Sequence, residues 1–251
     1  MSELVSIVMP VHNAERYLKD AIGSVIAQTY KNWELLIIDD ASTDSSKDIA
    51  IKMAEHDDRI KVYSNPTPTG YPANPRNIAI DSAQGRYIAF LDSDDVWLPN
   101  KLEHQIPFFN KDNNIAVIFS NYEKVDEELT RAARVVKAGR IIDYKTLLHG
   151  NVIGNVTAIY DTKMVGKVYF KKVRHEDYAM WLSILKRGFK AYNTGEVVSL
   201  YRVSSASVSA NKLHLLRWQW DIYRKVEKLS LLSSIYYYAN YAVRGFIKSL
   251  I

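Results

Sequence analysis

The chain has 251 residues, 47% of them hydrophobic and 24% charged, which is enough for one large α/β domain with an appendage. It contains no cysteine, so structural disulfides, cysteine–zinc sites and thiol chemistry are excluded. The N-terminal stretch MSELVSIVMPVHN lacks the basic and apolar regions of a signal peptide, and no segment reaches the roughly 18 apolar residues of a membrane span, so we expect a cytoplasmic protein.

The first half of the chain alternates strand-like with helix-like segments. Apolar runs predict strands at 4–10, 33–39, 60–64 and 86–91. Helical spacing and end signals predict the intervening helices: 14–25, a helix capped by Ser42 or Thr43, 76–85 with a C-terminal glycine, and Pro99 to Asn110. Strands that alternate with helices of this length indicate a doubly wound α/β sheet.

The second half of the chain is organised differently. Residues 121–205 mix polar strands, short helices and loops, and from about Asn211 the chain looks helical to its end. We therefore expect a sheet-forming subdomain at 1–120, a second subregion at 121–210 and a helical tail at 211–251.

The net charge of +5 is unevenly placed along the chain. Residues 212–251 contain seven Lys or Arg and two Asp or Glu, which leaves 26 of each sign in the rest. The basic character therefore belongs to the tail, whose aromatic and basic side chains include Arg217, Trp218, Trp220, Tyr223, Arg224, Lys225, Lys228, Tyr236, Tyr237, Tyr238, Tyr241, Arg244, Phe246 and Lys248.

One predicted strand ends in a cluster of carboxylates. In RYIAFLDSDDVWLP, residues 86–99, the apolar run is followed by Asp92, Asp94 and Asp95. Like charges repel, so this cluster is unfavourable unless a cation or a row of hydrogen-bond donors collects it. An Asp-x-Asp pair suits a hard divalent cation, Mn²⁺ or Mg²⁺, that bridges phosphate oxygens. Capping the next helix, the alternative role, needs one aspartate rather than three.

Polar residues also follow two other predicted strands, at 10–13 and at Asp39-Asp40. Ligands of open α/β sheets bind beyond the carboxyl ends of the strands, so these residues predict a single cleft. Asp39-Asp40 could instead form an Asx-turn, and Arg76, at a helix start, could contact a phosphate or be an ordinary surface arginine. No GxGxxG, GxxxxGK[ST] or GxSxG motif is present, which disfavours dinucleotide-binding enzymes, P-loop enzymes and α/β-hydrolases.

Four segments occur in the order found in glycosyltransferase family 2: VSIVMPVHNAERYL, WELLIIDDASTD, PRNIAIDSAQGRYIAFLDSDD and HEDYAMWLSILKRG. Over roughly residues 4–205 the chain resembles that family. The resemblance implies the GT-A fold, a Rossmann-like doubly wound mixed sheet, here with a C-terminal helical extension. It also implies a metal-dependent, inverting transfer of a hexosyl or N-acetylhexosaminyl group from a nucleotide-diphosphate sugar, with a UDP-sugar as the expected donor, to an acceptor hydroxyl.

The resemblance places the nucleotide-binding residues at the ends of the first two strands. Pro10, His12 and Glu15, together with Asp40, match the part that grips the base and ribose, and Arg76 joins them as a donor contact. His12 stands where tyrosine is frequent in the family, so the identity of the base and sugar stays open.

The resemblance also places the metal, the diphosphate and the base. Asp92 and Asp94 match the metal and diphosphate motif, Asp95 completes the usual DSDD, and Ser93 counts as a donor contact. Arg202 matches an arginine-containing loop near the diphosphate, and Asp177 of HEDYAMW matches the catalytic base.

The sequence also indicates how many sugars are transferred. The Gln-x-x-Arg-Trp motif of processive synthases is absent, which favours single-sugar transfer.

His175 lies beside the acidic pair Glu176-Asp177. It is either catalytic or, as we prefer, a polar surface residue.

The tail leaves two interpretations open. It suits an amphipathic helix pair on an anionic membrane surface, or a helical hairpin packed on the body or on a second subunit as a homodimer. No nucleic-acid-binding motif is present, so we expect no nucleic-acid partner. By family analogy, the acceptor is a glycan or lipid-linked glycan of bacterial surface polysaccharide (O-antigen, capsule or lipopolysaccharide) at the inner face of the cytoplasmic membrane.

Two other functions were weighed against this one. A sugar-phosphate nucleotidyltransferase needs a glycine-rich phosphate loop, which residues 10–20 lack. A nucleotide-sugar-binding pseudoenzyme would not need Asp92, Asp94 and Asp177, all of which are present.

Overall fold

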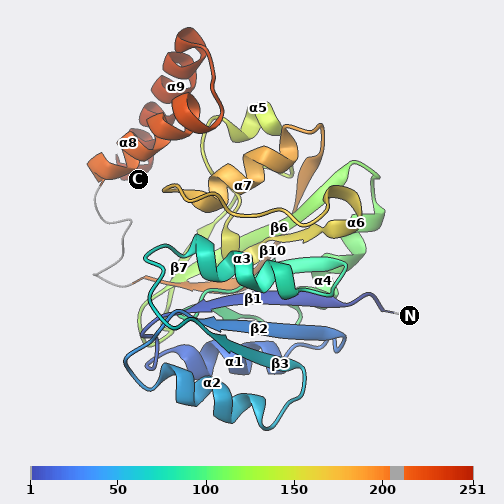
Figure 1. Ribbon diagram of the computed structural model, residues 1–251. Coiled ribbons are helices and arrows are strands. Elements are labelled where there is room, and N and C mark those ends of the chain that lie inside the picture. The colour runs from blue at the N-terminus through green and yellow to red at the C-terminus, as the bar shows by residue number, and fades with distance from the viewer. Residues whose placement is uncertain (1, 204–211, 251) are drawn as a thin grey trace.

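The centre of the protein is a mixed sheet, seen in a computed structural model that describes residues 2–203 and 212–250 (Figure 1). The described strands are β1 Val5–Val11, β2 Trp33–Asp39, β3 Ile60–Ser64, β4 Tyr87–Phe90, β5 Val96–Trp97, β6 Ile115–Val125, β7 Arg131–Val136, β8 Ile141–Ile142, β9 Ile159–Asp161 and β10 Lys190–Arg202. They follow the order β3-β2-β1-β4-β9-β6-β10-β5, with β7 beside β6 and β8 beside β10.

The helices lie on both faces of this sheet (Figure 1). The α-helices are α1 Leu18–Ile26, α2 Ser46–Ala54, α3 Ala73–Ser82, α4 Lys101–Gln105, α5 Tyr144–Leu147, α6 Thr162–Val165, α7 Glu176–Leu185, α8 Lys212–Asp221 and α9 Leu231–Leu250. The other helical turns are η1 Ile106–Asn110, η2 Asn155–Thr157 and the π-helical η4 Ile222–Val226. The predicted doubly wound mixed sheet with a helical extension is confirmed.

The sheet has a parallel part and a mixed part. Strands β3, β2, β1 and β4 run parallel, whereas β9 is antiparallel to both β4 and β6. β6 spans the expected boundary at residue 120, and β10 pairs parallel with it. One continuous sheet therefore carries both halves of the chain and aligns the ends of their strands.

Strand β2 shows why the sheet is covered on both faces. Every residue of β2 is buried, as expected for an apolar run without alternation. Leu35 and Ile37 belong to the apolar cluster under α1 and α2, while Leu36 and Ile38 belong to the cluster under α3 and α7. Two hydrophobic cores therefore hold the sheet between two helical layers.

Two predicted helix ends differ from the structure. α3 ends at Ser82 with Ala83 extended, so Gly85 does not cap it. Gly85 instead passes close to β1, where its N–H donates to Ser6 Oγ at 2.8 Å. Neither Ser42 nor Thr43 caps α2, because the Asp44 carboxylate accepts the Ser46 N–H at 2.9 Å.

The tail packs on the body through several residues, including those of 218–227. Tyr223 is fully buried and its hydroxyl donates to the Leu148 carbonyl at 2.6 Å. Glu227 accepts a hydrogen bond from Tyr144 at 2.7 Å and pairs with Lys186 at 3.0 Å. This part of the tail matches the packed-hairpin interpretation. The side chains of Arg244, Phe246 and Lys248 lie outside the described residues.

The far side of α9 is different. Its described apolar side chains include some that are largely exposed: Leu231, Leu232, Ile235, Tyr236 and Val243. None of the described helices is long and apolar enough to cross a membrane.

Replacing Gly85 with alanine should destabilise the fold. An added Cβ would lie 2.6 Å from the Ser6 nitrogen and 2.7 Å from the Leu4 oxygen, and these backbone atoms cannot move without disturbing β1. We expect Gly85→Ala to lower the free energy of unfolding in urea by about 2 kcal/mol or more.

Gly23→Ala is the matched control. Gly23 lies inside α1 with no atom within 4 Å of an added Cβ, so alanine should leave stability unchanged or raise it by about 0.5–1 kcal/mol. Equal urea midpoints for the two variants would contradict the close approach at Gly85.

Candidate active site

Two cavities lie side by side at the carboxyl edge of the parallel strands. We call them the His12 pocket, of about 380 Å³, and the Asp177 pocket, of about 350 Å³. Arg76 and Asp92 line both cavities, so the two pockets meet at this pair.

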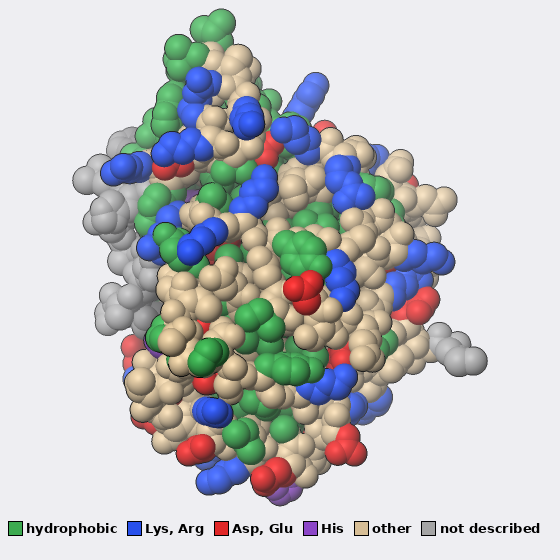
Figure 2. Space-filling view, viewed as in Figure 1, with side chains coloured by type: hydrophobic (Ala, Val, Ile, Leu, Met, Phe, Trp, Pro, Cys, Tyr) green, Lys and Arg blue, Asp and Glu red, His purple; other side chains and the backbone are tan. Residues whose placement is uncertain are grey.

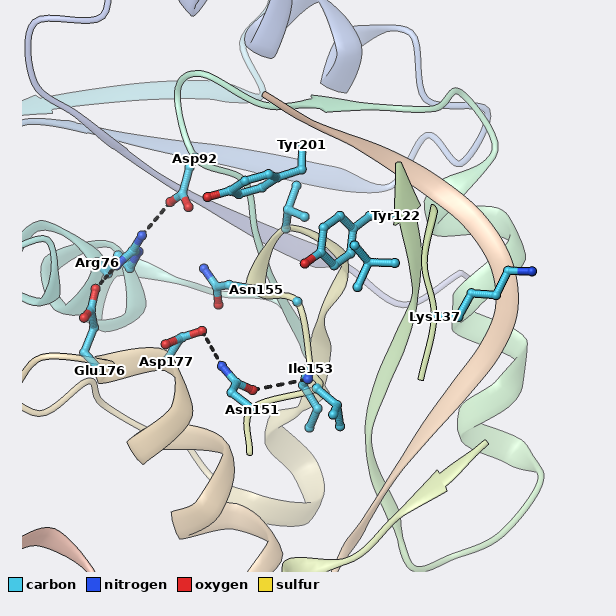
Figure 3. A pocket seen from close by; sticks show the side chains of 14 residues that line it. Arg76, Asp92, Tyr122, Lys137, Asn151, Ile153, Asn155, Glu176, Asp177 and Tyr201 are labelled. Carbon is cyan, nitrogen blue, oxygen red and sulfur yellow. Dashed lines mark hydrogen bonds and ion pairs between the residues drawn. The ribbon is translucent and has the colours of Figure 1, made fainter. Parts of the chain in front are cut away.

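The two pockets draw on different parts of the chain. The His12 pocket is built from the first half: Pro10, Val11, His12, Asp40, Pro68, Gly70, Tyr71, Pro72, Pro75, Arg76, Asp92 and Ser93. The Asp177 pocket is built largely from the second half: Arg76, Asp92, Tyr122, Val136, Lys137, Asn151, Val152, Ile153, Gly154, Asn155, Val156, Glu176, Asp177 and Tyr201 (Figure 3).

Arg76 is a buried cation held between two carboxylates. Its Nη2 lies 2.6 Å from Asp92 Oδ1 and its Nη1 lies 2.8 Å from Glu176 Oε1, while only 8% of its side chain is exposed (Figure 3). Burial alone would lower the pKa of Arg76, but Asp92 and Glu176 outweigh it and raise the pKa above its ordinary value. Arg76 is therefore not a surface arginine, and it links the end of β4 to the start of α7.

The three carboxylates after β4 lie in different environments. Asp92 faces the pockets and pairs with Arg76. Partial desolvation by the surrounding loop raises the pKa of Asp94 to about 6, and the Asp92 charge adds to the rise, although the residue itself is exposed. Asp95 is buried: its Oδ1 accepts the Arg202 N–H at 2.9 Å, its Oδ2 has no partner, and burial raises its pKa well above the ordinary value.

Two of the three aspartates, Asp92 and Asp94, are suited to hold a divalent cation. Asp92 and Asp94 both reach solvent, and a cation near them would offset the repulsion between their charges. Asp92 lines both pockets, whereas Asp94 and Asp95 line neither. Among the described residues no group of three His, Asp or Glu side chains is arranged to hold a metal ion. An ion held by Asp92 and Asp94 would therefore need its remaining ligands from water and a bound phosphate, as Mg²⁺ commonly takes them.

Asp40 lines the His12 pocket and holds the loop that forms one of its walls. This carboxylate accepts hydrogen bonds from Asn65 Nδ2 at 2.7 Å and from the Thr69 hydroxyl at 2.8 Å and N–H at 3.1 Å, which ties down the loop before α3. His12 Nδ1 donates to the Asp40 carbonyl at 2.8 Å, since a carbonyl oxygen can only accept. Asp40 thus shapes the pocket chiefly by fixing the loop that walls it.

The structure brings most of the predicted donor-contact residues together. Pro10 and Ser93 line the His12 pocket beside His12 itself. Glu15 lies outside both pockets, and its carboxylate accepts the Ser45 N–H at 2.9 Å next to the start of α2. Glu15 is therefore engaged at a helix N-terminus.

Arg202 lies beside the aspartate loop but lines neither pocket. Its Nε donates to the Asp94 carbonyl at 2.8 Å, its Nη1 to the Glu127 carbonyl, and its Nη2 to Asp20 at 3.2 Å. Its guanidinium also lies 4.3 Å from the centroid of the Tyr17 ring. These contacts make Arg202 a clamp that holds the loop containing Asp94 against β10.

Asp177 and Glu176 are adjacent at the start of α7 but have different partners. Glu176 pairs with Arg76, whereas Asp177 Oδ2 accepts a hydrogen bond from Asn151 Nδ2 at 2.8 Å (Figure 3). Burial raises the pKa of Asp177 to about 6, and the neighbouring Glu176 charge adds to the rise. A carboxylate whose pKa lies near neutrality and which faces a cavity is suited to accept a proton.

The rest of the Asp177 pocket was not found from the sequence. Tyr122 and Tyr201 project from β6 and β10 with ring centroids 5.7 Å apart, and Asn155 has a buried Oδ1 with no partner (Figure 3). Such a mixture of aromatic faces and amide groups suits a sugar ring with its hydroxyls. The available signal was the repeated Gly-Asn-Val at 150–152 and 154–156.

The chain is similar over nearly its whole length to curated bacterial proteins. It is 42% identical over 246 residues to the Escherichia coli UDP-Glc:alpha-D-GlcNAc-diphosphoundecaprenol beta-1,3-glucosyltransferase WfgD, covering 98% of this chain and 94% of that protein. It is 36% identical over 248 residues to the putative teichuronic acid biosynthesis glycosyltransferase TuaG of Bacillus subtilis, covering 98% of each.

Solved structures share the fold at lower identity. Staphylococcus aureus TarS 1-349 in complex with UDP-GlcNAc matches with a TM-score of 0.73 and 19% identity, covering 98% of this chain and 73% of that one. The Pyrobaculum calidifontis mannosyltransferase PcManGT, in complex with GDP-Man and Mn²⁺, matches with a TM-score of 0.70 and 14% identity, covering 97% and 74%. The pattern of glycosyl transferase family 2 matches residues 6–173, and this chain belongs to that family of glycosyltransferases with the GT-A fold.

Proposed function

We propose that the protein transfers one hexosyl group, with inversion, from a UDP-sugar to a hydroxyl of a lipid-linked glycan in bacterial surface polysaccharide synthesis. The observation that carries this proposal is the junction of two pockets at Arg76 and Asp92, with Asp177 facing the second pocket. The similarity to WfgD, whose name gives a UDP-glucose donor and a diphosphoundecaprenol-linked acceptor, supports the choice of substrates.

In this proposal the first half of the chain, 1–120, binds the donor. The His12 pocket takes the nucleoside, and the diphosphate extends toward Arg76 and Asp92 at the shared edge. Asp92 and Asp94 would hold a divalent cation, which would supply charge neutralisation for the departing diphosphate. Asp95 and Arg202 act indirectly, since their hydrogen bond fixes the loop that presents Asp94.

The second subregion, 121–210, binds the acceptor and supplies the base. The acceptor sugar occupies the Asp177 pocket, with its ring against Tyr122 or Tyr201 and its hydroxyls near Asn151 and Asn155. Asp177 accepts the proton of the attacking acceptor hydroxyl. The oxygen of that hydroxyl bonds to the anomeric carbon on the face opposite the diphosphate, while the bond from this carbon to the diphosphate oxygen breaks. Such general-base assistance contributes roughly 10²–10⁴ in rate.

The exposed side of α9 is proposed to lie on the membrane that carries the acceptor. Apolar side chains spaced along one helix face, Leu232, Ile235, Tyr236 and Val243, are largely exposed. Figure 2 shows hydrophobic side chains gathered at the top of the molecule, where Figure 1 draws α9. The exposed Arg224, Lys225 and Lys228 precede this helix, and the tail carries an excess of positive charge. A basic helix with one apolar face suits anionic lipid, while two such tails would repel each other in a homodimer.

The cation can be tested by removing it. If Asp92 and Asp94 hold it on the diphosphate, excess chelator should abolish transfer and Mn²⁺ or Mg²⁺ should restore it, as measured by release of UDP in the presence of acceptor. Asp94→Asn should lose at least a hundredfold in kcat while keeping its thermal midpoint, since the pKa of Asp94 is already raised by burial. Full activity in chelator would refute the role of the ion.

The base can be tested by comparing two neighbouring carboxylates. Asp177→Asn should lower kcat at least a hundredfold and leave UDP affinity within about twofold, because it removes a group used in the chemical step. Glu176→Gln should cost about tenfold or less, since Glu176 acts by pairing with Arg76.

The pH dependence separates the same two residues. Only ionised Asp177 accepts a proton, so kcat/KM should fall as the pH drops through about 6. The Glu176 charge raises the pKa of Asp177 and Arg76 lowers it, so Glu176→Gln should move this limb to lower pH. A greater loss in Glu176→Gln than in Asp177→Asn would overturn the assignment.

The membrane contact can be tested on the full chain with vesicles. Leu232→Glu together with Ile235→Glu should weaken binding to phosphatidylglycerol vesicles at least tenfold, because two apolar side chains no longer enter the lipid. Ile141→Glu is the control, since Ile141 is 56% exposed on β8 of the body and should not affect binding. Unchanged vesicle binding would show that this face of α9 does not contact the membrane. Loss of a dimer in the double variant, measured by sedimentation, would show that a second copy of the chain covers this face instead.

A further inference from the structure

The helix α8 lies against the segment that carries the proposed base (Figure 1). The Trp218 ring meets the His175 ring edge to face, with centroids 5.6 Å apart. The guanidinium carbon of Arg174 lies 5.5 Å from the Trp218 ring centroid, within the range of a cation–π contact. Trp218 therefore contacts the two residues that directly precede Glu176 and Asp177.

The next residue of α8 reaches the other side of the base. Gln219 is buried, and its Nε2 donates to the Tyr178 hydroxyl at 3.3 Å. Tyr178 Oη in turn donates to the Leu147 carbonyl at 2.9 Å. Consecutive residues of α8 thus contact positions 174, 175 and 178, and Asp177 lies between them.

The backbone before the base needs such support. His175 has φ 58° and ψ 45°, a left-handed conformation that is uncommon for a residue with a side chain, and its side chain makes no capping hydrogen bond to α7. The turn at His175 sets the direction in which α7 begins. Contacts that hold the His175 ring therefore help to fix the direction of the Asp177 carboxylate.

The same contacts extend to the donor side. Arg174 also lies 5.5 Å from the ring centroid of Tyr71, and Lys172 lies 5.0 Å from it. Tyr71 lines the His12 pocket. The row Tyr71, Arg174, Trp218 therefore connects the loop that walls the donor pocket with the start of α7 and with the tail.

We propose that Trp218 is a positioning residue for the transfer reaction, which makes α8 a support of the active site. Trp218 holds Arg174 and His175 so that Asp177 points at the acceptor hydroxyl. Trp218 itself does not touch the substrate. This inference rests on the proposed role of Asp177 as the base. A small displacement of a positioned group lowers the rate much more than the affinity, since reacting atoms must be aligned closely.

The test is a kcat and KM comparison on the full-length protein. Trp218→Ala should lower kcat about tenfold, with the KM for donor and acceptor and the binding of UDP each within about threefold. Trp218→Phe should restore at least half of kcat, since a phenyl ring keeps a face for Arg174 and an edge for His175.

Trp220→Ala is the matched control. Trp220 is two residues further along α8, and its ring contacts Tyr238 of α9 at 5.3 Å. Trp220→Ala removes the same kind of side chain from the same helix. Any loss of tail packing should therefore lower its thermal midpoint as much as that of Trp218→Ala. The kcat of Trp220→Ala should stay within about twofold of the unsubstituted protein.

Three results would overturn the inference: a normal kcat in Trp218→Ala, an equal loss in Trp220→Ala, or no rescue by Trp218→Phe. Asp177→Asn, measured in parallel, separates this failure from failure of the proposed function. An inactive Asp177→Asn with an active Trp218→Ala leaves the base in place and refutes only the positioning role. An active Asp177→Asn refutes the base itself.

Discussion

The active site depends on one buried guanidinium. Arg76 comes from α3, and its two carboxylate partners, Asp92 and Glu176, come from the end of β4 and the start of α7. A buried charge without a partner costs several kcal/mol, so the native arrangement must keep both carboxylates within reach of Arg76. This requirement fixes the position of α7 relative to the parallel strands. It also fixes the shared edge at which the two pockets meet.

The Arg76 pair also explains how two adjacent carboxylates can have different roles. Glu176 is neutralised by Arg76, so its charge is satisfied within the protein. Asp177 accepts a hydrogen bond from the amide of Asn151, and burial beside Glu176 raises its pKa to about 6. The same separation occurs among the aspartates after β4. Asp92 pairs with Arg76 and Asp95 is buried against the Arg202 N–H, while Asp94 keeps contact with solvent. In both clusters, the like charges that looked unfavourable in the sequence are separated by their partners.

The sequence predicted the parallel half of the fold well because its signals are local. The apolar runs 33–39 and 60–64 coincide with β2 and β3, and the polar ends of the strands do meet at one edge. Features that depend on distant contacts were not predictable. Glu15 occupies a position of the family motif, yet its carboxylate accepts a backbone N–H beside α2. Arg202 also occupies such a position, and its guanidinium donates to backbone carbonyls of two different loops. The same reason applies to Gly85, whose position is set by its approach to Ser6 on β1 rather than by a helix end.

The contrast between the two pockets follows from where their residues lie in the chain. The His12 pocket uses strand ends and one loop within 1–93, where the regular α/β pattern positions each residue and where the family pattern also matches. The Asp177 pocket combines β6, the loop 151–156, α7 and β10, and Asp177, the proposed base, lies beyond residue 173, where the family match ends. Its geometry is therefore maintained by individual contacts between segments distant in the sequence, such as Asn151 on Asp177 and Trp218 on His175. In the proposed function, a donor pocket built from regular elements adjoins an acceptor pocket built from individual contacts, so changes in those contacts would alter the acceptor and leave nucleotide binding intact.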